Sequence, residues 1–265
     1  MQPLVIFIAA LLFVSCATLS PNGVGRVKHY KVDNNCLPDE FDGFTFAFIS
    51  DIHYPSKFTR KRLGKVVRRL REENPQMLLL GGDYVTADRY IDELFDSLST
   101  IKTEYGTYAV LGNHEFHRSD KIESAMNEYG IYLLLDETVE IRGDSSCIYL
   151  SGIRNPFIVE NRSFTGELPD SLFSIVLSHT PDYAQDIDIR ADIVLSGHTH
   201  GGQVSLLGLY APVTNSHYGS RFLSGLNYTD SNVPVITTNG VGTSRRKIRF
   251  CVPSEILFIT LRGKK

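Results

Sequence analysis

The chain alternates short apolar runs with longer segments whose apolar residues recur every three or four positions. Phe44 to Ser50 is a short apolar and aromatic run, which is typical of a buried strand. Arg60 to Glu73 places its apolar residues on one helical face, and Pro75 prevents the helix from continuing. The residues of that face are Leu63, Val66, Val67 and Leu70. The pattern therefore predicts a strand followed by a helix.

The same alternation recurs in the next part of the chain. Met77 to Leu80 reads as a buried strand, and the apolar residues between Ile91 and Ile101 form a helical stripe. Thr107 to Leu111 is again strand-like, and a further helix is expected from about Asp120 to Gly130. Strands and helices in strict succession favour parallel strand pairing through crossover helices.

The later part of the chain is dominated by strand-like segments with few long helices between them. They are residues 131–135, 139–142, 147–153, 173–178, 192–196, 233–238 and 255–261. A second sheet packed on the first is therefore expected. We predict an α/β (α+β) fold in residues 43–265, with two mixed β-sheets packed as a sandwich and helices at its flanks.

The N-terminus differs from the rest, because Leu4 to Val14 is apolar throughout and no charged residue precedes Arg26. This pattern predicts an export signal in residues 1–16, and the residues before Cys16 resemble the site at which bacterial lipoprotein signals are cut. An uncleaved anchor with a cytoplasmic domain is the alternative, although the apolar stretch is short for a bilayer span of about 20 residues. Residues 17–42 are rich in Asn, Pro, Gly and Ser and are predicted to be a tether. We therefore expect an exported or membrane-attached protein of the bacterial cell envelope.

Composition narrows the function without identifying it. The chain has 265 residues, 42% apolar content and a formal charge of −3, which suits one compact core. That charge argues against a surface that neutralises many phosphates, so nucleic acid is not expected as a partner. If Cys16 is lipidated, three cysteines remain, and an odd number does not indicate a disulfide framework.

Polar residues follow five of the predicted strands directly. They are Asp51 and His53, Asp83, Asn113 and His114, His179, and His198 and His200. A lone His is more often an ordinary surface or core residue, and a Gly-Gly-Asp string can be a simple turn. The carboxyl ends of parallel strands, however, face one crevice, so the five groups are expected to meet there. Imidazole, carboxylate and amide groups at one place indicate a metal site.

These residues resemble the signature of the calcineurin-like metallophosphoesterases, from about Phe44 to Gln203. The matching strings are Asp51-x-His53, Gly82-Asp83, Gly112-Asn113-His114-Glu115, His179 and Gly197-His198-x-His200. The resemblance implies the metallophosphoesterase fold and two divalent metal ions. It assigns Asp51, His53 and His200 to one ion and Asn113, His179 and His198 to the other, with Asp83 bridging both. Mixed nitrogen and oxygen ligands favour Mn or Fe, with Zn possible.

The resemblance also implies a reaction. Two metals about 3.5–4 Å apart lower the pKa of a water between them and align its attack in line with the leaving group. We therefore expect a phosphoesterase acting on phosphodiester or pyrophosphate bonds, with phosphomonoesters as the alternative. His114 matches the family's non-ligand histidine and is predicted to be the general acid. Glu115 either orients a neighbouring ligand or is a carboxylate favoured at a helix N-terminus. A non-catalytic metal-binding scaffold is the rival from another class.

Further candidates lie nearer the C-terminus. His217 and Arg221 belong to a polar loop that could approach the substrate, and Arg249 could meet an anionic group near Gly240 and Gly242. Ordinary surface cations are the alternative interpretation. The C-terminal strings are similar to a bacterial branch with membrane-associated phosphodiesterases and enzymes that cleave UDP-2,3-diacylglucosamine. That similarity suggests a membrane-associated or nucleotide-lipid substrate, met through the N-terminus.

Overall fold

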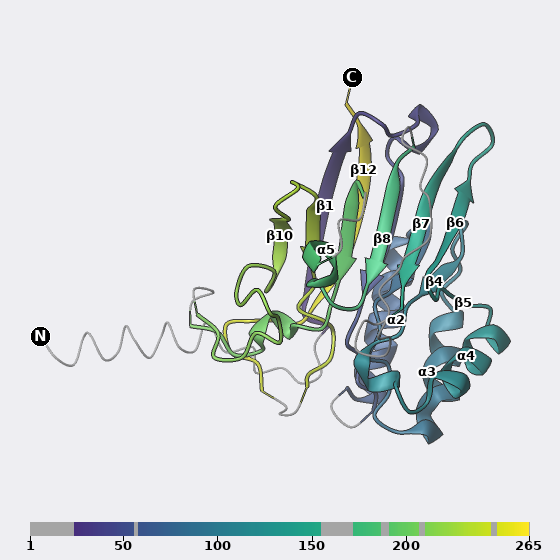
Figure 1. The fold of residues 1–265 in the computed structure, drawn as a ribbon. Coiled ribbons are helices and arrows are strands. Elements are labelled where there is room, and N and C mark those ends of the chain that lie inside the picture. The colour runs from purple at the N-terminus through teal and green to yellow at the C-terminus, as the bar shows by residue number, and fades with distance from the viewer. Residues whose placement is uncertain are drawn as a thin grey trace, which may run out of the picture.

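Two six-stranded sheets form the framework of the protein (Figure 1). The computed structural model describes residues 24–55, 58–154, 172–186, 191–206, 210–244 and 248–264. The predicted signal or anchor in residues 1–16 lies outside these ranges. Among the residues that are described, no helix is long and apolar enough to cross a bilayer.

The first sheet has the strand order β1-β12-β2-β3-β4-β5. Its strands are β1 (Arg26–Asn34), β2 (Thr45–Ile49), β3 (Met77–Leu80), β4 (Thr107–Ala109), β5 (Tyr132–Leu133) and β12 (Glu255–Gly263). The pairs from β2 to β5 are parallel, as the alternation of strands and helices predicts, while β12 runs antiparallel to β2. The carboxyl ends of β2, β3 and β4 therefore meet at one edge of the sheet.

The second sheet has the strand order β10-β11-β9-β8-β7-β6. Its strands are β6 (Glu137–Arg142), β7 (Cys147–Ile153), β8 (Ser174–Ser178), β9 (Ile193–Ser196), β10 (Gly225–Tyr228) and β11 (Pro234–Thr237). The four central strands β7, β8, β9 and β11 are parallel, and antiparallel strands form the two edges. The carboxyl ends of β8 and β9 thus also share one edge.

Helices follow the strands of the first sheet. They are α2 (Arg60–Glu73), α3 (Ile91–Ser99) and α4 (Ser119–Glu128), with a short α5 (Tyr183–Asp186) in the second half. The Thr59 side chain accepts a hydrogen bond from the Arg62 backbone N–H and starts α2, and Asn74 ends it in a left-handed conformation. Four 3-10 turns complete the described elements: η1 (Asp39–Phe41), η2 (Asp88–Tyr90), η3 (Asn113–Glu115) and η4 (His200–Gly202).

Strand alternation divides the core into layers. In β2, Phe46 and Phe48 point between the two sheets, whereas Ala47 and Ile49 point towards the helices. Leu177 and Leu195 meet the phenylalanines from the second sheet. Figure 1 shows α3 and α4 together beside β4 and β5. The predicted α/β fold of two mixed sheets packed as a sandwich with flanking helices is confirmed.

Residues 17–42 were predicted to be a tether, but residues 26–34 of this range form the strand β1. Residues 26–34 pair in parallel with residues 255–263 of β12 as an edge strand. Exposed and partly buried positions alternate along β1, and none is fully buried, so its apolar signal is weak. Lys28 also reaches the buried Glu255, with Nζ 2.7 Å from Oε2. The edge strand is therefore held by a distant partner that a local pattern does not reveal.

Candidate metal centre

The polar residues that follow the strands of both sheets converge at one end of the sandwich. Asp51 and His53 follow β2, Asp83 follows β3, and Asn113 opens η3 just after β4. From the second sheet, His179 follows β8, His198 follows β9, and His200 opens η4. Sequence positions up to 149 residues apart, from Asp51 to His200, thus contribute to one cluster.

Several residues of the cluster have left-handed backbones. The φ angles are 57° at Asp51, 50° at His53, 57° at Asp83, 68° at His198 and 52° at His200. This conformation costs a non-glycine residue about 1–2 kcal/mol. The turns are held by backbone bonds between neighbouring strand ends, such as Asp51 N–H to Gly82 O at 2.9 Å and His53 N–H to Asp83 O at 3.0 Å. Such strain is concentrated at functional sites in proteins, and here the surrounding sheets maintain it.

Asp51, His53 and His200 form the first group of possible ligands. His200 Nε2 lies 3.3 Å from Asp51 Oδ1 and 3.2 Å from His53 Nε2. All three residues are buried. Asp51 Oδ1 accepts no hydrogen bond from any residue that the structure describes, although it is buried. An orphaned carboxylate oxygen facing two imidazole nitrogens is the arrangement that a cation would satisfy.

Asn113, His179 and His198 form the second group. His179 Nε2 lies 3.2 Å from both Asn113 Oδ1 and His198 Nδ1. On its other side, His179 Nδ1 is 2.7 Å from Gly81 O. Because a carbonyl oxygen only accepts, Nδ1 carries the proton and Nε2 keeps its lone pair for a ligand role.

Asp83 lies between the two groups. Its Oδ2 is 3.5 Å from His53 Nε2, and its Oδ1 is 3.6 Å from His179 Nε2. One oxygen therefore faces a histidine of each group. The His114 backbone N–H donates to Oδ1 at 3.0 Å, which fixes the orientation of the carboxylate. These donors suit a pair of divalent cations held by nitrogen and oxygen ligands.

The protonation states of the cluster depend on its burial. Burial lowers the pKa of His200 to about 4 and that of His198 to about 3, so both imidazoles are neutral near pH 7. Burial and the charge of Asp51 raise the pKa of Asp83 well above its ordinary value. Burial raises the pKa of Asp51 too, but the attraction of the imidazoles of His200, His179 and His53 in their protonated form outweighs burial and holds the pKa of Asp51 below its ordinary range. The site thus presents neutral imidazoles and buried acids whose repulsion a cation would relieve.

His114 lies at the mouth of the cluster. Its side chain is 45% exposed, and its Nε2 is 3.8 Å from Asp83 Oδ2. Its ring meets that of His53 edge to face, with centroids 4.7 Å apart. His114 is therefore more accessible to a substrate than the histidines behind it.

Glu115 is a positioning residue whose two roles the sequence left open. Its wholly buried carboxylate accepts backbone hydrogen bonds from Asp83 at 2.8 Å, Tyr84 at 3.0 Å and Gly112 at 2.8 Å. Burial, and next the charge of Asp83, raise its pKa to about 7. The carboxylate thus ties the turn that carries Asp83 to the turn that carries Asn113, in addition to lying in the first turn of η3.

Arg249 is 8% exposed and directs its guanidinium at backbone carbonyls. It donates to His200 O at 3.1 Å, to Asn239 O at 2.6 Å and to Gly242 O at 2.6 Å. The Gly242 N–H donates in turn to Asp51 O at 2.8 Å. The segment around Gly240 and Gly242, which the sequence offered for close approach to a substrate, here packs on the Asp51 turn instead. A Cβ on Gly240 would lie 2.7 Å from that of Asp51.

His217 and Arg221 lie in the polar loop before β10. The His217 side chain is 72% exposed, and its backbone N–H donates to Asp182 Oδ2 at 2.7 Å. Arg221 pairs with Asp230 at 2.8 Å and donates to Tyr228 O at 2.8 Å. Among the described residues, neither side chain belongs to a group of His and acidic side chains close enough together to hold a metal ion.

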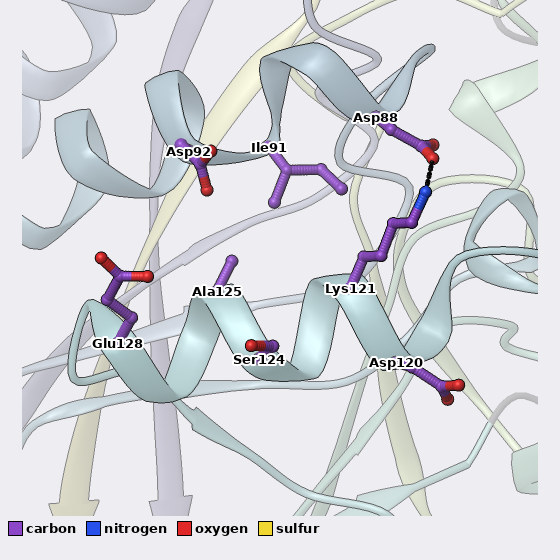
Figure 2. Close-up of a pocket in the computed structure, with 8 residues that line it drawn as sticks. All are labelled: Asp88, Ile91, Asp92, Asp120, Lys121, Ser124, Ala125 and Glu128. Atoms are coloured by element: carbon purple, nitrogen blue, oxygen red, sulfur yellow. Dashed lines mark hydrogen bonds and ion pairs between the residues drawn. The ribbon is translucent and has the colours of Figure 1, made fainter.

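A separate hollow of about 370 Å³ lies between α3 and α4 (Figure 2). Its lining is Asp88, Ile91, Asp92, Asp120, Lys121, Ser124, Ala125 and Glu128. Lys121 pairs with Asp88 across it. The hollow shares no residue with the metal cluster, and its acids face solvent along two helices, which is an ordinary solvated surface.

Comparison of the sequence with known protein families matches the part of the chain that contains the cluster. The family model described as calcineurin-like phosphoesterase matches residues 44–202, a range that contains every candidate ligand and His114. The protein named uncharacterized metallophosphoesterase YkuE of Bacillus subtilis is 29% identical over 256 residues, which cover 92% of this chain and 88% of that protein. Phosphodiesterase YaeI of Escherichia coli is 29% identical over 213 residues, covering 76% of each protein. Among solved structures, a dimetal phosphatase from Danio rerio aligns with a TM-score of 0.47 at 15% identity, covering 83% of this chain and 99% of that one.

Proposed function

The chain belongs to the calcineurin-like phosphoesterase family and is a metal-dependent phosphoesterase, and from that premise we propose that it hydrolyses a phosphodiester or pyrophosphate bond. The observation that carries the proposal is the position of Asp83, whose two oxygens face one histidine from each group. One ion would be held by Asp51, His53 and His200, and the other by Asn113, His179 and His198. Both ions would be bound by Asp83. The ions would supply an activated water and a positive charge beside the phosphoryl oxygens. Mn or Fe suits this mixture of nitrogen and oxygen ligands, with Zn the next choice.

His114 would act as the general acid. It lies beside the ligands, yet its side chain is 45% exposed, so it can reach the oxygen that departs with the leaving group. Removing a general acid slows a reaction by about 10²–10⁴-fold. Glu115 and Arg249 would hold the ligand turns in place and take no part in proton transfer, because their polar atoms bind backbone groups.

A phosphodiester or pyrophosphate is preferred to a phosphomonoester as the substrate. The Escherichia coli relative is named a phosphodiesterase, and that name supports the same class here. The branch of the family that cleaves UDP-2,3-diacylglucosamine suggests a nucleotide-lipid or membrane-associated substrate. A phosphomonoesterase and a non-catalytic metal-binding scaffold are the two alternatives.

Attachment to the cell envelope forms a separate part of the proposal. It rests on the apolar run from Leu4 to Val14, and the tether would then begin at residue 17 and end before β1 (Arg26–Asn34). The mass of the mature N-terminus distinguishes a lipidated Cys16 from an anchor that retains Met1. An unmodified, uncleaved chain recovered from the soluble fraction would contradict attachment.

The activity is tested on purified protein loaded separately with Mn, Fe or Zn. The substrates are bis(4-nitrophenyl) phosphate, 4-nitrophenyl phosphate and a nucleotide diphosphate ester. We expect turnover of the diester or the pyrophosphate, loss of bound metal in Asp83→Asn, and loss of turnover with metal retained in His114→Ala. His117→Ala is the matched control, because His117 is also exposed and lies outside the cluster.

Three outcomes separate the alternatives. Faster cleavage of the monoester than of either other substrate would favour the phosphomonoesterase. Two bound metals with no turnover of any substrate would favour the scaffold. Turnover by His114→Ala at the rate of His117→Ala would remove His114 from its assigned role.

A further inference from the structure

An apolar cavity adjoins the candidate metal centre. It has a volume of about 330 Å³ and begins at Thr199 and His200, in the turn that carries two of the possible ligands. Val204, Pro212, Val213 and Ile248 form its apolar walls. The size lies within the range of about 300–1,000 Å³ that small-molecule pockets occupy. The cavity is therefore large enough for a ligand and reaches the reactive end of the sandwich.

Exposed large apolar side chains gather around this cavity. The exposed fractions are 38% for Val204, 57% for Leu206, 64% for Tyr210, 48% for Val213 and 59% for Ile248. Of the nine large apolar residues that are exposed in the described ranges, these five lie in or beside the cavity segments. Exposed apolar surface gathered around one hollow marks a binding site more often than scattered exposure does.

Backbone hydrogen bonds define the walls of the cavity. Ser205 N–H donates to Phe250 O at 3.0 Å, and Phe250 N–H donates to Gln203 O at 3.0 Å. The Gln203 side-chain oxygen accepts from Ser244 N–H at 2.8 Å. These polar groups are bound to one another, and Val204, Pro212, Val213 and Ile248 leave a surface that is largely hydrocarbon beside Thr199, His200 and Asn215.

We propose that the cavity binds a hydrocarbon arm of the substrate, so that the favoured phosphodiesters carry an alkyl or acyl chain on one side of the phosphorus. This inference rests on the proposed function and extends it to the substrate class. With the phosphate at the metal centre, a hydrocarbon arm directed towards the Thr199 and His200 side would lie against the apolar walls of the cavity. Each methylene buried there increases affinity about fourfold.

The test is a series of 4-nitrophenyl alkyl phosphates with methyl, butyl and octyl arms, used below the concentrations at which they form micelles. In each hydrolysis the water oxygen bonds to phosphorus, the bond from phosphorus to the nitrophenyl oxygen breaks, and 4-nitrophenol and the alkyl phosphate leave. We expect kcat/KM to rise about tenfold or more from methyl to octyl, as burial of only two methylenes would give. Calorimetry with octyl phosphate and methyl phosphate on the metal-loaded protein measures the same preference without turnover.

Variants locate the effect in the cavity. Val213→Ser makes one wall polar and is expected to reduce the octyl-to-methyl ratio about threefold or more, since it removes apolar contact. Leu226→Ser is the matched control, because Leu226 is similarly exposed at 44% but lies on β10 outside the cavity. Circular dichroism checks that both variants fold.

The outcomes keep this inference distinct from the proposed function. Equal kcat/KM for the methyl and octyl esters would overturn the hydrocarbon subsite while leaving the phosphodiesterase activity intact. No cleavage of any ester, combined with tighter binding of octyl phosphate than methyl phosphate, would overturn the activity and support the subsite. The last outcome combines two results for Val213→Ser: an unchanged octyl-to-methyl ratio of kcat/KM, and loss of sedimentation with phospholipid vesicles. Together they would show that the rim contacts a bilayer instead, which also overturns the subsite.

Discussion

Replacing Arg249 by Met removes the cation that joins three parts of the metal-site end. The guanidinium donates to carbonyls of His200, Asn239 and Gly242, and these segments carry a possible ligand and support the Asp51 turn. Met has a similar length and fills the space, but it donates no hydrogen bond. The substitution therefore tests the bonds more than the packing.

The expected size of the effect follows from two opposing contributions. Three hydrogen bonds from a charged donor contribute about 2 kcal/mol each, or about 6 kcal/mol in all. Burial lowers the pKa of Arg249 from 12.5 to about 10, which corresponds to about 3 kcal/mol against the charged form. The difference predicts a loss of about 3 kcal/mol in the free energy of unfolding.

Urea unfolding of the metal-free protein measures that loss. With a denaturant dependence of about 3 kcal/mol per molar urea, the midpoint should fall by about 1 M. Metal affinity, measured by calorimetry with Mn, should fall as well, because the His200 turn loses its anchor. Arg221→Met is the matched control, since Arg221 pairs with an exposed Asp230 and should cost only about 0–1 kcal/mol. An Arg249→Met protein with unchanged urea midpoint and Mn affinity would refute the reasoning.

Three further changes probe the same site. Glu115→Gln replaces the carboxylate that accepts from Asp83 and Gly112, so we expect a loss of about 2–3 kcal/mol and a lower metal content, measured by thermal unfolding and elemental analysis. Burial lowers the pKa of His200 to about 4, so the unfolded chain takes up a proton before the folded one as pH falls. The contribution of His200 to the stability of the metal-free protein, measured as the difference in urea unfolding between the wild type and His200→Asn, should therefore be full above about pH 6.5 and decrease by about 2 kcal/mol at pH 5. Gly112→Ala would put a Cβ 2.2 Å from Asp83 Oδ1 and should abolish calorimetric metal binding, whereas full binding would contradict that clash.

The parts of the fold with strong local patterns could be predicted from the sequence. The predicted helix over Arg60 to Glu73 has the same bounds as α2, and the run from Cys147 to Ile153 is β7. The edge strands β1 and β10 were not predicted. β10 exposes Leu226 and Tyr228, and its pairing with β11 depends on tertiary context, so its local signal is weak.

Some features of the site could likewise be predicted from the sequence, and others could not. The possible ligands could be found because each directly follows an apolar run, and the family resemblance they suggested is confirmed. The role of Arg249 could not be predicted from the sequence. A basic residue in a glycine-rich string looks the same whether its side chain faces an anion or backbone carbonyls. The apolar cavity beside His200 could not be predicted from the sequence either. Its walls come from segments that precede β10 and follow β11, so they are distant in the chain.

The two sheets contribute separate halves of the proposed ligand set. Asp51, His53, Asp83 and Asn113 come from the first sheet, and the three remaining histidines come from the second. Bound ions would therefore join the two sheets of the sandwich. Folding and metal binding would then be thermodynamically linked. At a free metal concentration a hundredfold above its dissociation constant, each ion would add about 2.7 kcal/mol to stability. The supply of metal would then determine the stability of the folded protein as well as its rate of turnover.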